Sequence, residues 1–260
     1  MEAFKMTASA NNNSIPLRLG KSYVEGMAVS VASTTTLGVA AGVCRDSGNL
    51  NDLVLSAAVT INFANAGVVN GIDTGAIGAS KLYYVYVIGS SLDPNGLVYP
   101  QGGLVSLSET PLLPNGYDIY RRVGWARSGG SSTLLTMYQS GEGNVRQYSY
   151  DIMIAELASG TSQTLAAIDL ASSCPPLDNM KVNFFVEFTP ATAADTVKFA
   201  PFGSTATLIP GVSGAVAAIK QSMQVPVLAK LDSGVPKVLY INSAASCDSD
   251  IWVQGFEDVL

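Results

Sequence analysis

The chain of 260 residues contains no histidine. A Ser-His-Asp or Cys-His catalytic arrangement requires an imidazole as its base, and an imidazole-based metal site requires one as ligand. Most hydrolase mechanisms are therefore excluded. The tripeptides Asp46-Ser47-Gly48 and Asp232-Ser233-Gly234 resemble the nucleophile segment of some serine proteases. Without a base, we interpret both as Asx-type turns, in which the carboxylate accepts a hydrogen bond from the backbone two residues on.

Charged residues are also scarce. They make up 13% of the chain, against about 25% of an ordinary soluble domain. The 48% of hydrophobic residues suffices for a core, and so little charge suggests that copies of the chain or partner proteins cover much of its exterior. A soluble monomer with a surface rich in Ser, Thr and Asn is the alternative. The net charge of −6 and the pI near 4.6 would repel phosphate backbones, so no nucleic acid is expected as a partner.

Cysteine occurs three times, without CxxC spacing, at Cys44, Cys174 and Cys247. Neither a disulfide framework nor a zinc site is indicated. One pair of cysteines could form a disulfide, but an odd number of cysteines is more typical of buried thiols in a reducing cytosol. Residues 1 to 7 also lack the basic-then-apolar layout of a secretion signal. Asp248-Ser249-Asp250 could ligate calcium, although a solvated turn suits so short an acidic run better. The sequence predicts no cofactor and no metal.

Long apolar runs are missing as well. Two uncharged stretches, residues 53 to 72 and 199 to 219, are interrupted by Asn, Ser, Gly or Pro. A membrane-spanning helix needs about 20 predominantly apolar residues. Membrane insertion is therefore not expected.

The chain is rich instead in period-two alternation and turn residues. Val59, Ile61 and Phe63 alternate with small or polar neighbours, which predicts a half-buried strand. The tyrosine-rich run 82 to 88 is a second strand, and the turn signal Asp93-Pro94-Asn95-Gly96 leads into residues 97 to 99, which predicts a hairpin. Turn clusters recur along the chain and helix signals are scarce. This pattern is typical of an all-β sandwich or barrel.

We predict an all-β fold with two β-sandwich modules of jelly-roll-like type, preceded by an extended arm. The arm comprises residues 1 to 20, the first module 21 to 140 and the second 141 to 260, with the boundary in the glycine-bearing segment 140 to 144. The arm has no hydrophobic face to bury locally. Either a neighbouring molecule orders it, or it is a frayed terminus without a role.

Two segments carry a resemblance to a known class of proteins. The first begins with YYVYVI at Tyr83 and ends with YRRVGWAR at Arg127, and the second is the tail DIWVQGFED at residues 250 to 258. Both resemble virion proteins of tailed bacteriophages, and the resemblance spans most of residues 22 to 260. It implies a virion part that is oligomeric and commonly trimeric. Such modules occur in tail fibres, tail appendages and capsid-attached proteins.

The candidate binding or interface residues are two arginines and two tryptophans. Arg121 and Arg122 form the basic pair of the chain, and beside Trp125 they could stack or accept a carboxylate. Most such pairs are solvated residues of a strand face or members of an ion pair within the fold. Trp125 and Trp252 would face solvent if they stacked on sugars, and would lie in the core or an interface if their role were structural.

Carboxylates are the remaining candidates for chemistry. Glycoside hydrolysis needs two of them about 5 to 10 Å apart, and the sequence alone brings no two together. The candidates are Asp118, Glu142, Asp151, Glu156, Glu187, Glu257 and Asp258. Phage depolymerases that cleave glycans are usually much longer and built around a solenoid of repeats. No repeat of about 20 to 50 residues is visible here. We assign no catalytic residue and expect no enzymatic activity.

The leading functional hypothesis is a non-enzymatic structural component of a tailed-phage virion, a tail fibre or tail-appendage subunit. A capsid decoration protein or head fibre is the first alternative, and a glycan-binding surface module is the second. The expected partners are copies of the chain, with a trimer favoured, other virion proteins and, for the second alternative, a host-surface glycan. The expected location is the virion, after synthesis and assembly in the host bacterial cytoplasm.

Overall fold

The computed structural model describes residues 23–91, 101–141, 143–205 and 209–260. The predicted arm of residues 1 to 20, the turn at 93 to 96 with the strand at 97 to 99, and Glu142 lie outside the described residues. Within the described ranges the protein is all-β and sandwich-like, and it has no helix. The predicted fold class is confirmed.

The first module, β1 to β10, consists mostly of short strands. Its strands are β1 (Val24–Gly26), β2 (Val29–Val31), β3 (Thr36–Val39), β4 (Gly42–Arg45), β5 (Asp52–Leu55), β6 (Val59–Asn62), β7 (Gly71–Ile72), β8 (Leu82–Gly89), β9 (Gly102–Ser106) and β10 (Ile119–Arg127). They form three sheets, with the strand orders β1-β4-β5, β2-β3-β6 and β10-β8-β9-β7. All pairs are antiparallel except β7 with β9.

Strand β8 is buried on both of its faces. Tyr83, Val85 and Val87 point into the core of the first module, together with Leu37, Ile61 and other apolar residues of the small sheets. Tyr84, Tyr86 and Ile88 point to the other side, into an apolar cluster that continues into the second module. A strand with apolar residues at successive positions is expected where both faces of a sheet are covered. Val59, Ile61 and Phe63, in contrast, show the predicted alternation, because Thr60 between them is exposed.

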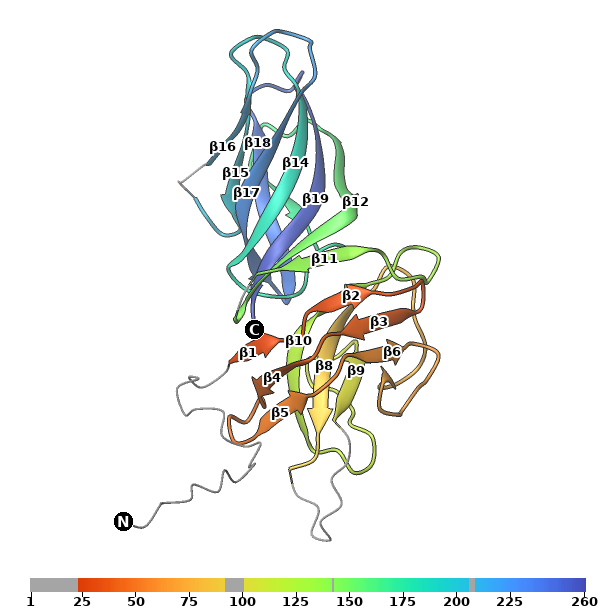
Figure 1. Ribbon diagram of the computed structural model, residues 1–260. Helices are drawn as coiled ribbons and strands as arrows, with labels where there is room; N and C mark the ends of the chain where they lie inside the picture. The colour runs from red at the N-terminus through yellow and green to blue at the C-terminus, as the bar shows by residue number, and fades with distance from the viewer. Residues whose placement is uncertain (1–22, 92–100, 142, 206–208) are drawn as a thin grey trace, which may run out of the picture.

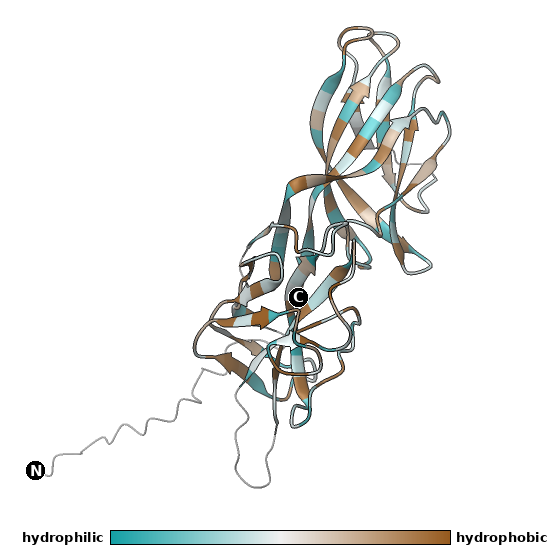
Figure 2. Cartoon of the chain, turned by 90° about the vertical axis from the view of Figure 1, so that its right-hand side faces the viewer, coloured by the Kyte–Doolittle hydropathy of each residue, from teal (hydrophilic) through white to brown (hydrophobic). Residues whose placement is uncertain are grey.

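The second module, β11 to β19, is one sheet that curls on itself. Its strands are β11 (Met137–Ser140), β12 (Val145–Gly160), β13 (Ala166–Asp169), β14 (Met180–Thr189), β15 (Thr196–Pro201), β16 (Ile209–Ser213), β17 (Gln221–Asp232), β18 (Val235–Asn242) and β19 (Asp248–Val259). The strand order is β11-β12-β19-β14-β17-β18-β15-β16, and β13 pairs with β18. Polar and apolar bands alternate along the long strands (Figure 2). Their inner residues close around a core in which the Phe184 and Phe199 rings lie 5.6 Å apart.

The two modules are stacked end to end (Figure 1). The C-terminal end of β19 and the strand β11 lie at the junction. Although β11 precedes the predicted boundary at residue 140, it pairs with β12 from Met137 opposite Tyr150 to Ser140 opposite Gln147. Gly141 and Gly143, both with positive φ, belong to the hairpin between these strands. Glycine favours a tight hairpin as much as a linker, so the sheet membership changes before the glycines and not at them.

The two serine-protease-like tripeptides lie in turns, as predicted, but the contacts of their carboxylates differ from those of an Asx-type turn, since Asp232 accepts from the Lys237 ammonium and the Ser233 hydroxyl. Asp46 accepts hydrogen bonds at one carboxylate oxygen from the amides of Leu50 and Asn51, both at 2.7 Å. Ser233 and Gly234 have φ of 53° and 83° and connect β17 to β18. Both segments therefore serve chain reversal.

Candidate functional site

Strand β10 carries three of the four predicted site residues, Arg121, Arg122 and Trp125. It pairs with β8, and the register shifts between Arg122 and Gly124. A β-bulge adds one residue to one strand, so two side chains separated by an odd number of positions reach the same face. Arg122 and Trp125 consequently lie together, with the guanidinium carbon 4.9 Å from the centre of the indole ring. The predicted stacking of this arginine on the tryptophan is present.

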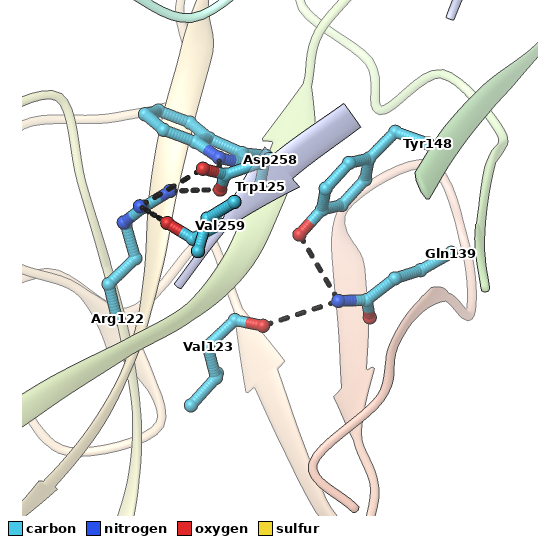
Figure 3. A network of polar contacts seen from close by, with 7 residues as sticks. All are labelled: Arg122, Val123, Trp125, Gln139, Tyr148, Asp258 and Val259. Atoms are coloured by element: carbon cyan, nitrogen blue, oxygen red, sulfur yellow. Dashed lines mark hydrogen bonds and ion pairs between the residues drawn. The ribbon is translucent and has the colours of Figure 1, made fainter. Parts of the chain in front are cut away.

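Asp258, near the end of β19, joins this pair from the second module (Figure 3). Its carboxylate accepts hydrogen bonds from Arg122 Nη1, from Arg122 Nη2 at 3.3 Å and from Trp125 Nε1 at 2.7 Å. The Asp258 side chain is 1% exposed and that of Arg122 is 19% exposed. A guanidinium fork on a carboxylate is a strong, directional pair. Of the alternatives expected for Arg122, an ion pair within the fold is present, and its carboxylate lies 136 residues further on in the same chain.

Gln139 of β11 connects the same two modules through its side-chain amide (Figure 3). Its Nε2 donates to the Val123 carbonyl at 3.3 Å and to the Tyr148 hydroxyl at 3.1 Å. Its Oε1 accepts from the backbone amide of Val29. One amide thus binds two strands of the first module and one of the second. Sequence reasoning missed Gln139, because no local pattern marks a glutamine that bridges distant strands.

Tyr148 of β12 is buried at the junction and stacks on Phe256, with ring centres 4.8 Å apart. Burial, reinforced by the nearby negative charge of Asp258, raises the pKa of Tyr148 well above its usual range. Arg146, two residues earlier on the same face, donates to the Gly26 carbonyl at 2.8 Å and to the Gly141 carbonyl at 3.0 Å. The junction is therefore a dry, hydrogen-bonded surface and not an exposed linker.

Arg121 lies on the other side of β10 from Arg122. It is 8% exposed, and desolvation by burial lowers its pKa. It borders a hollow of about 280 Å³ that is also lined by Tyr86, Glu109 and Tyr120. The Tyr86 hydroxyl donates to the Glu109 carbonyl at 2.6 Å. The two adjacent arginines thus lie on opposite sides of β10, although both line this hollow.

Trp252 is far less enclosed than Trp125. Trp125 is 1% exposed and belongs to the apolar cluster that joins the modules. Trp252 is partly exposed on the outer face of β19, where its ring lies 5.9 Å from that of Phe185 at an angle of 54°. Trp125 therefore fits the structural role that was predicted for it, whereas Trp252 can still contact a partner. The structure does not bring the two tryptophans together.

The three cysteines lie in the interior of the protein. All three cysteines are buried and unpaired, and burial raises the pKa of Cys44 and Cys174 to about 12. Thiols with so high a pKa are poor nucleophiles at neutral pH. Among the described residues, no group of three or more Cys, Asp or Glu side chains is placed to hold a metal ion. No described helix is long and apolar enough to cross a membrane.

Comparisons with known proteins found only weak structural similarities. No family model matches the chain, and no curated protein does. Among solved structures, the chain is similar to an Arthrobacter globiformis T6 isomalto-dextranase complexed with panose, with a TM-score of 0.20 and 14% identity over 62% of this chain and 27% of that one. It is also similar to the mosquito-larvicidal Cry4Aa toxin of Bacillus thuringiensis, with a TM-score of 0.21 and 10% identity over 92% of this chain and 52% of the toxin. The chain spans about a quarter of the first protein and about half of the second.

Proposed function

We propose that the protein is a non-enzymatic structural component of a tailed-phage virion, a tail fibre or tail-appendage subunit, in which two β-modules act as one rigid unit. The observation that carries the proposal is the burial of Asp258 against Arg122 and Trp125. A buried ion pair between strands 136 residues apart fixes orientation, because each charge is stable only when its partner is in place. A structural element that spaces two other parts of a particle requires such a fixed orientation.

The absence of enzymatic activity is part of the proposal. The charged and polar groups at the junction bind each other, since Asp258 holds Arg122 and Gln139 holds Tyr148. Groups engaged in this way are not available to bind or activate a substrate. The lack of histidine removes the commonest general base as well.

The virion context rests on the sequence resemblance of residues 83 to 127 and 250 to 258, and on the low charge of the chain. These two segments contain Arg122, Trp125 and Asp258. The resemblance therefore covers the residues that join the modules, which is what a shared module-joining device would require. A homo-oligomer, with a trimer favoured, follows from the same reasoning. Large apolar side chains that a neighbouring copy could cover are Leu50, Leu112, Ile152 and Val259.

Immunogold labelling of intact phage particles, with antibodies raised against the purified chain, tests the proposal. We expect gold on the tail or its appendages, and mass spectrometry of purified particles should detect the chain. Gold on the head would favour the capsid decoration alternative. Absence of the chain from purified particles would contradict the virion assignment altogether.

Light scattering of the purified protein tests the oligomeric part of the proposal. We expect a mass close to three times the 27.0 kDa of one chain. A monomer at micromolar concentration, together with a monomeric state in material released from particles, would contradict it.

A further inference from the structure

The outer face of the second module carries an organised set of aromatic and amide side chains. On β14, Val182, Phe184 and Val186 point into the core, so Asn183 and Phe185 point outward and are partly exposed. Residues directly opposite each other on paired strands share a face of the sheet. The register therefore defines which neighbours stand beside these two.

The first row of this face crosses three strands. Phe185 stands opposite Trp252 of β19 on one side and opposite Gln224 of β17 on the other. The two rings are tilted by 54° and do not form one plane. Each ring therefore presents its own face or edge outward. Such an uneven surface suits a compact ligand better than it suits a flat surface of a partner.

The second row lies one step along the strands. Gly255 of β19 stands opposite Asn183 of β14 and opposite Ser149 of β12. Ser149 in turn stands opposite Tyr138 of β11, whose side chain is 60% exposed. Tyr138 therefore stands at one end of the row that contains Ser149, Gly255 and Asn183. Trp252 and Phe185 stand in the neighbouring row.

A hollow of about 500 Å³ lies on this face and shares Gln224 with the first row and Ser149, Asn183 and Gly255 with the second. Its lining includes Ser149, Asn183, Gln224, Pro226, Gln254 and Gly255. Gly255 is required by the close approach of β12, because a Cβ there would lie 1.9 Å from the Tyr148 carbonyl oxygen. Since glycine has no side chain, it also leaves this part of the sheet uncovered. The register between β12 and β19 shifts from Ser149 to Ile154, so the strands separate beside Gln254.

Charged residues at both ends of this face form ion pairs. At one end Lys220 binds Glu187 at 2.9 Å and Asp250 at 3.2 Å. At the other end Lys181 lies 3.9 Å from Glu257. The groups between the two ends are amides, a hydroxyl and aromatic rings. This centre suits an uncharged ligand with many hydroxyl groups better than an anion or a cation.

We propose that this face binds a neutral saccharide, which stacks a sugar ring on Trp252, Phe185 or Tyr138 and directs its hydroxyls to the amides in the hollow. An aromatic face is electron-rich and attracts the C–H groups on one face of a pyranose ring. Each side-chain amide of Asn183, Gln224 and Gln254 offers both donors and an acceptor, as sugar hydroxyls require. A few convergent polar groups in a concave site fix the orientation of a small ligand, and in this hollow Ser149, Asn183, Gln224 and Gln254 are such groups.

The site does not depend on the proposed virion role, and it differs from the glycan-binding surface expected from the sequence. That expectation had both Trp125 and Trp252 facing solvent, whereas Trp125 is buried at the junction. The companions of Trp252 are Phe185, Tyr138, the amides of Asn183 and Gln224 from other strands, and the amide of Gln254 from β19 itself. The occupant to be distinguished from a saccharide is a second copy of the chain, which would cover the same aromatic rings.

A glycan microarray of neutral and acidic oligosaccharides, followed by calorimetric titration of the best-binding neutral oligosaccharide, tests the proposal. The full chain should bind neutral oligosaccharides in preference to acidic ones. Trp252→Ala and Tyr138→Ala should each weaken binding about tenfold, and Gln224→Ala should weaken it by about threefold to tenfold. Leu107→Ala, which removes an exposed apolar side chain from the first module, is the matched control and should leave the affinity unchanged.

Three results would overturn the proposal. The first is the absence of binding to every neutral oligosaccharide at millimolar concentration. The second is binding that Tyr138→Ala and Gln224→Ala leave unchanged, since both residues are exposed and neither substitution disturbs the core. The third is a fall in oligomer mass on Tyr138→Ala in a protein that binds no saccharide, which would assign the face to contacts between copies.

Discussion

Strands β8 and β14 show how differently the two modules use a central strand. Every residue of β8 from Tyr83 to Gly89 is buried, because one face packs on the core of the first module and the other on the cluster at the junction. Along β14 buried and partly exposed residues alternate from Val182 to Thr189. The first module is thus enclosed on both sides of its main sheet, whereas the second keeps one face open.

This difference separates two roles within one chain. The face of β8 that carries Tyr84, Tyr86 and Ile88 belongs to the apolar cluster in which residues of β10, β12 and β19 meet. The first module therefore uses this face for its connection with the second module. The open face of β14 is free for a ligand. A continuous apolar run marks the connecting strand, and alternation marks the strand with a solvent face.

Alanine substitutions at adjacent positions test this contrast most strongly. Phe184→Ala should lower the free energy of unfolding by about 3–5 kcal/mol, because it empties part of the core, whereas Phe185→Ala on the open face should cost about 1 kcal/mol or less. On β8, both Val87→Ala and Ile88→Ala should be destabilising, by about 2 kcal/mol or more each. Urea denaturation measures all four. A small loss in the free energy of unfolding on Ile88→Ala would mean that the face of β8 that carries Ile88 is not enclosed.

Removal of the carboxylate at the junction should have the next largest effect. Asp258→Ala leaves Arg122 and the Trp125 indole nitrogen without their acceptor, and we expect a loss of about 3 kcal/mol in urea denaturation. This is the lower end of the range for a buried pair, because Arg122 is partly exposed to water. Asp258→Asn, which keeps one acceptor oxygen, should cost less. Equal losses from both variants would show that charge, and not hydrogen bonding, holds the junction.

Alkaline pH should weaken the junction through its buried tyrosines. Burial raises the pKa of Tyr86 and Tyr148 well above the usual value, which is about 10 in an unfolded chain. The folded state therefore holds these protons more tightly than the unfolded state, and the associated stability is complete below about pH 10 and is lost as the pH rises through the folded pKa values. The urea midpoint should fall above about pH 10, and less steeply in Tyr86→Phe and Tyr148→Phe. An unchanged midpoint across this range would contradict the burial.

The smallest effect is expected for the ion pair at the edge of the open face. Lys181 and Glu257 are 50% and 30% exposed and lie 3.9 Å apart. Pairs of this kind contribute about 1 kcal/mol or less, so Lys181→Ala should shift the urea midpoint only slightly. A loss comparable to that of Asp258→Ala would mean that the face is less open than its exposure indicates.

Local patterns predicted the fold class but not the connections between the modules. The alternation of Val59, Ile61 and Phe63 and the turns at Asp46 and Asp232 follow from neighbouring residues, so they were predicted correctly. Arg122 and Trp125 were identified as candidates from the sequence. Asp258 was also among the candidate carboxylates, but its pairing with Arg122 was not predicted, because the two residues are 136 positions apart and the pairing depends on the complete fold.

The same limit applies to the open face and to β11. Trp252 was a candidate, but its neighbours Phe185, Gln224 and Tyr138 come from strands that the sequence does not order within a sheet. The glycines at 141 and 143 were interpreted as a boundary and form a hairpin instead. Period and turn residues indicate where strands lie, whereas the choice of partner strand is set by long-range packing.

Differential scanning calorimetry of the full chain tests the central claim, that the two modules form one unit, most directly. The account predicts a single unfolding transition whose calorimetric and van't Hoff enthalpies agree. It also predicts that Asp258→Ala separates this transition into two or broadens it. Two well-resolved transitions in the unmodified protein, with Asp258→Ala shifting neither relative to the other, would show that the modules unfold independently and would contradict the account.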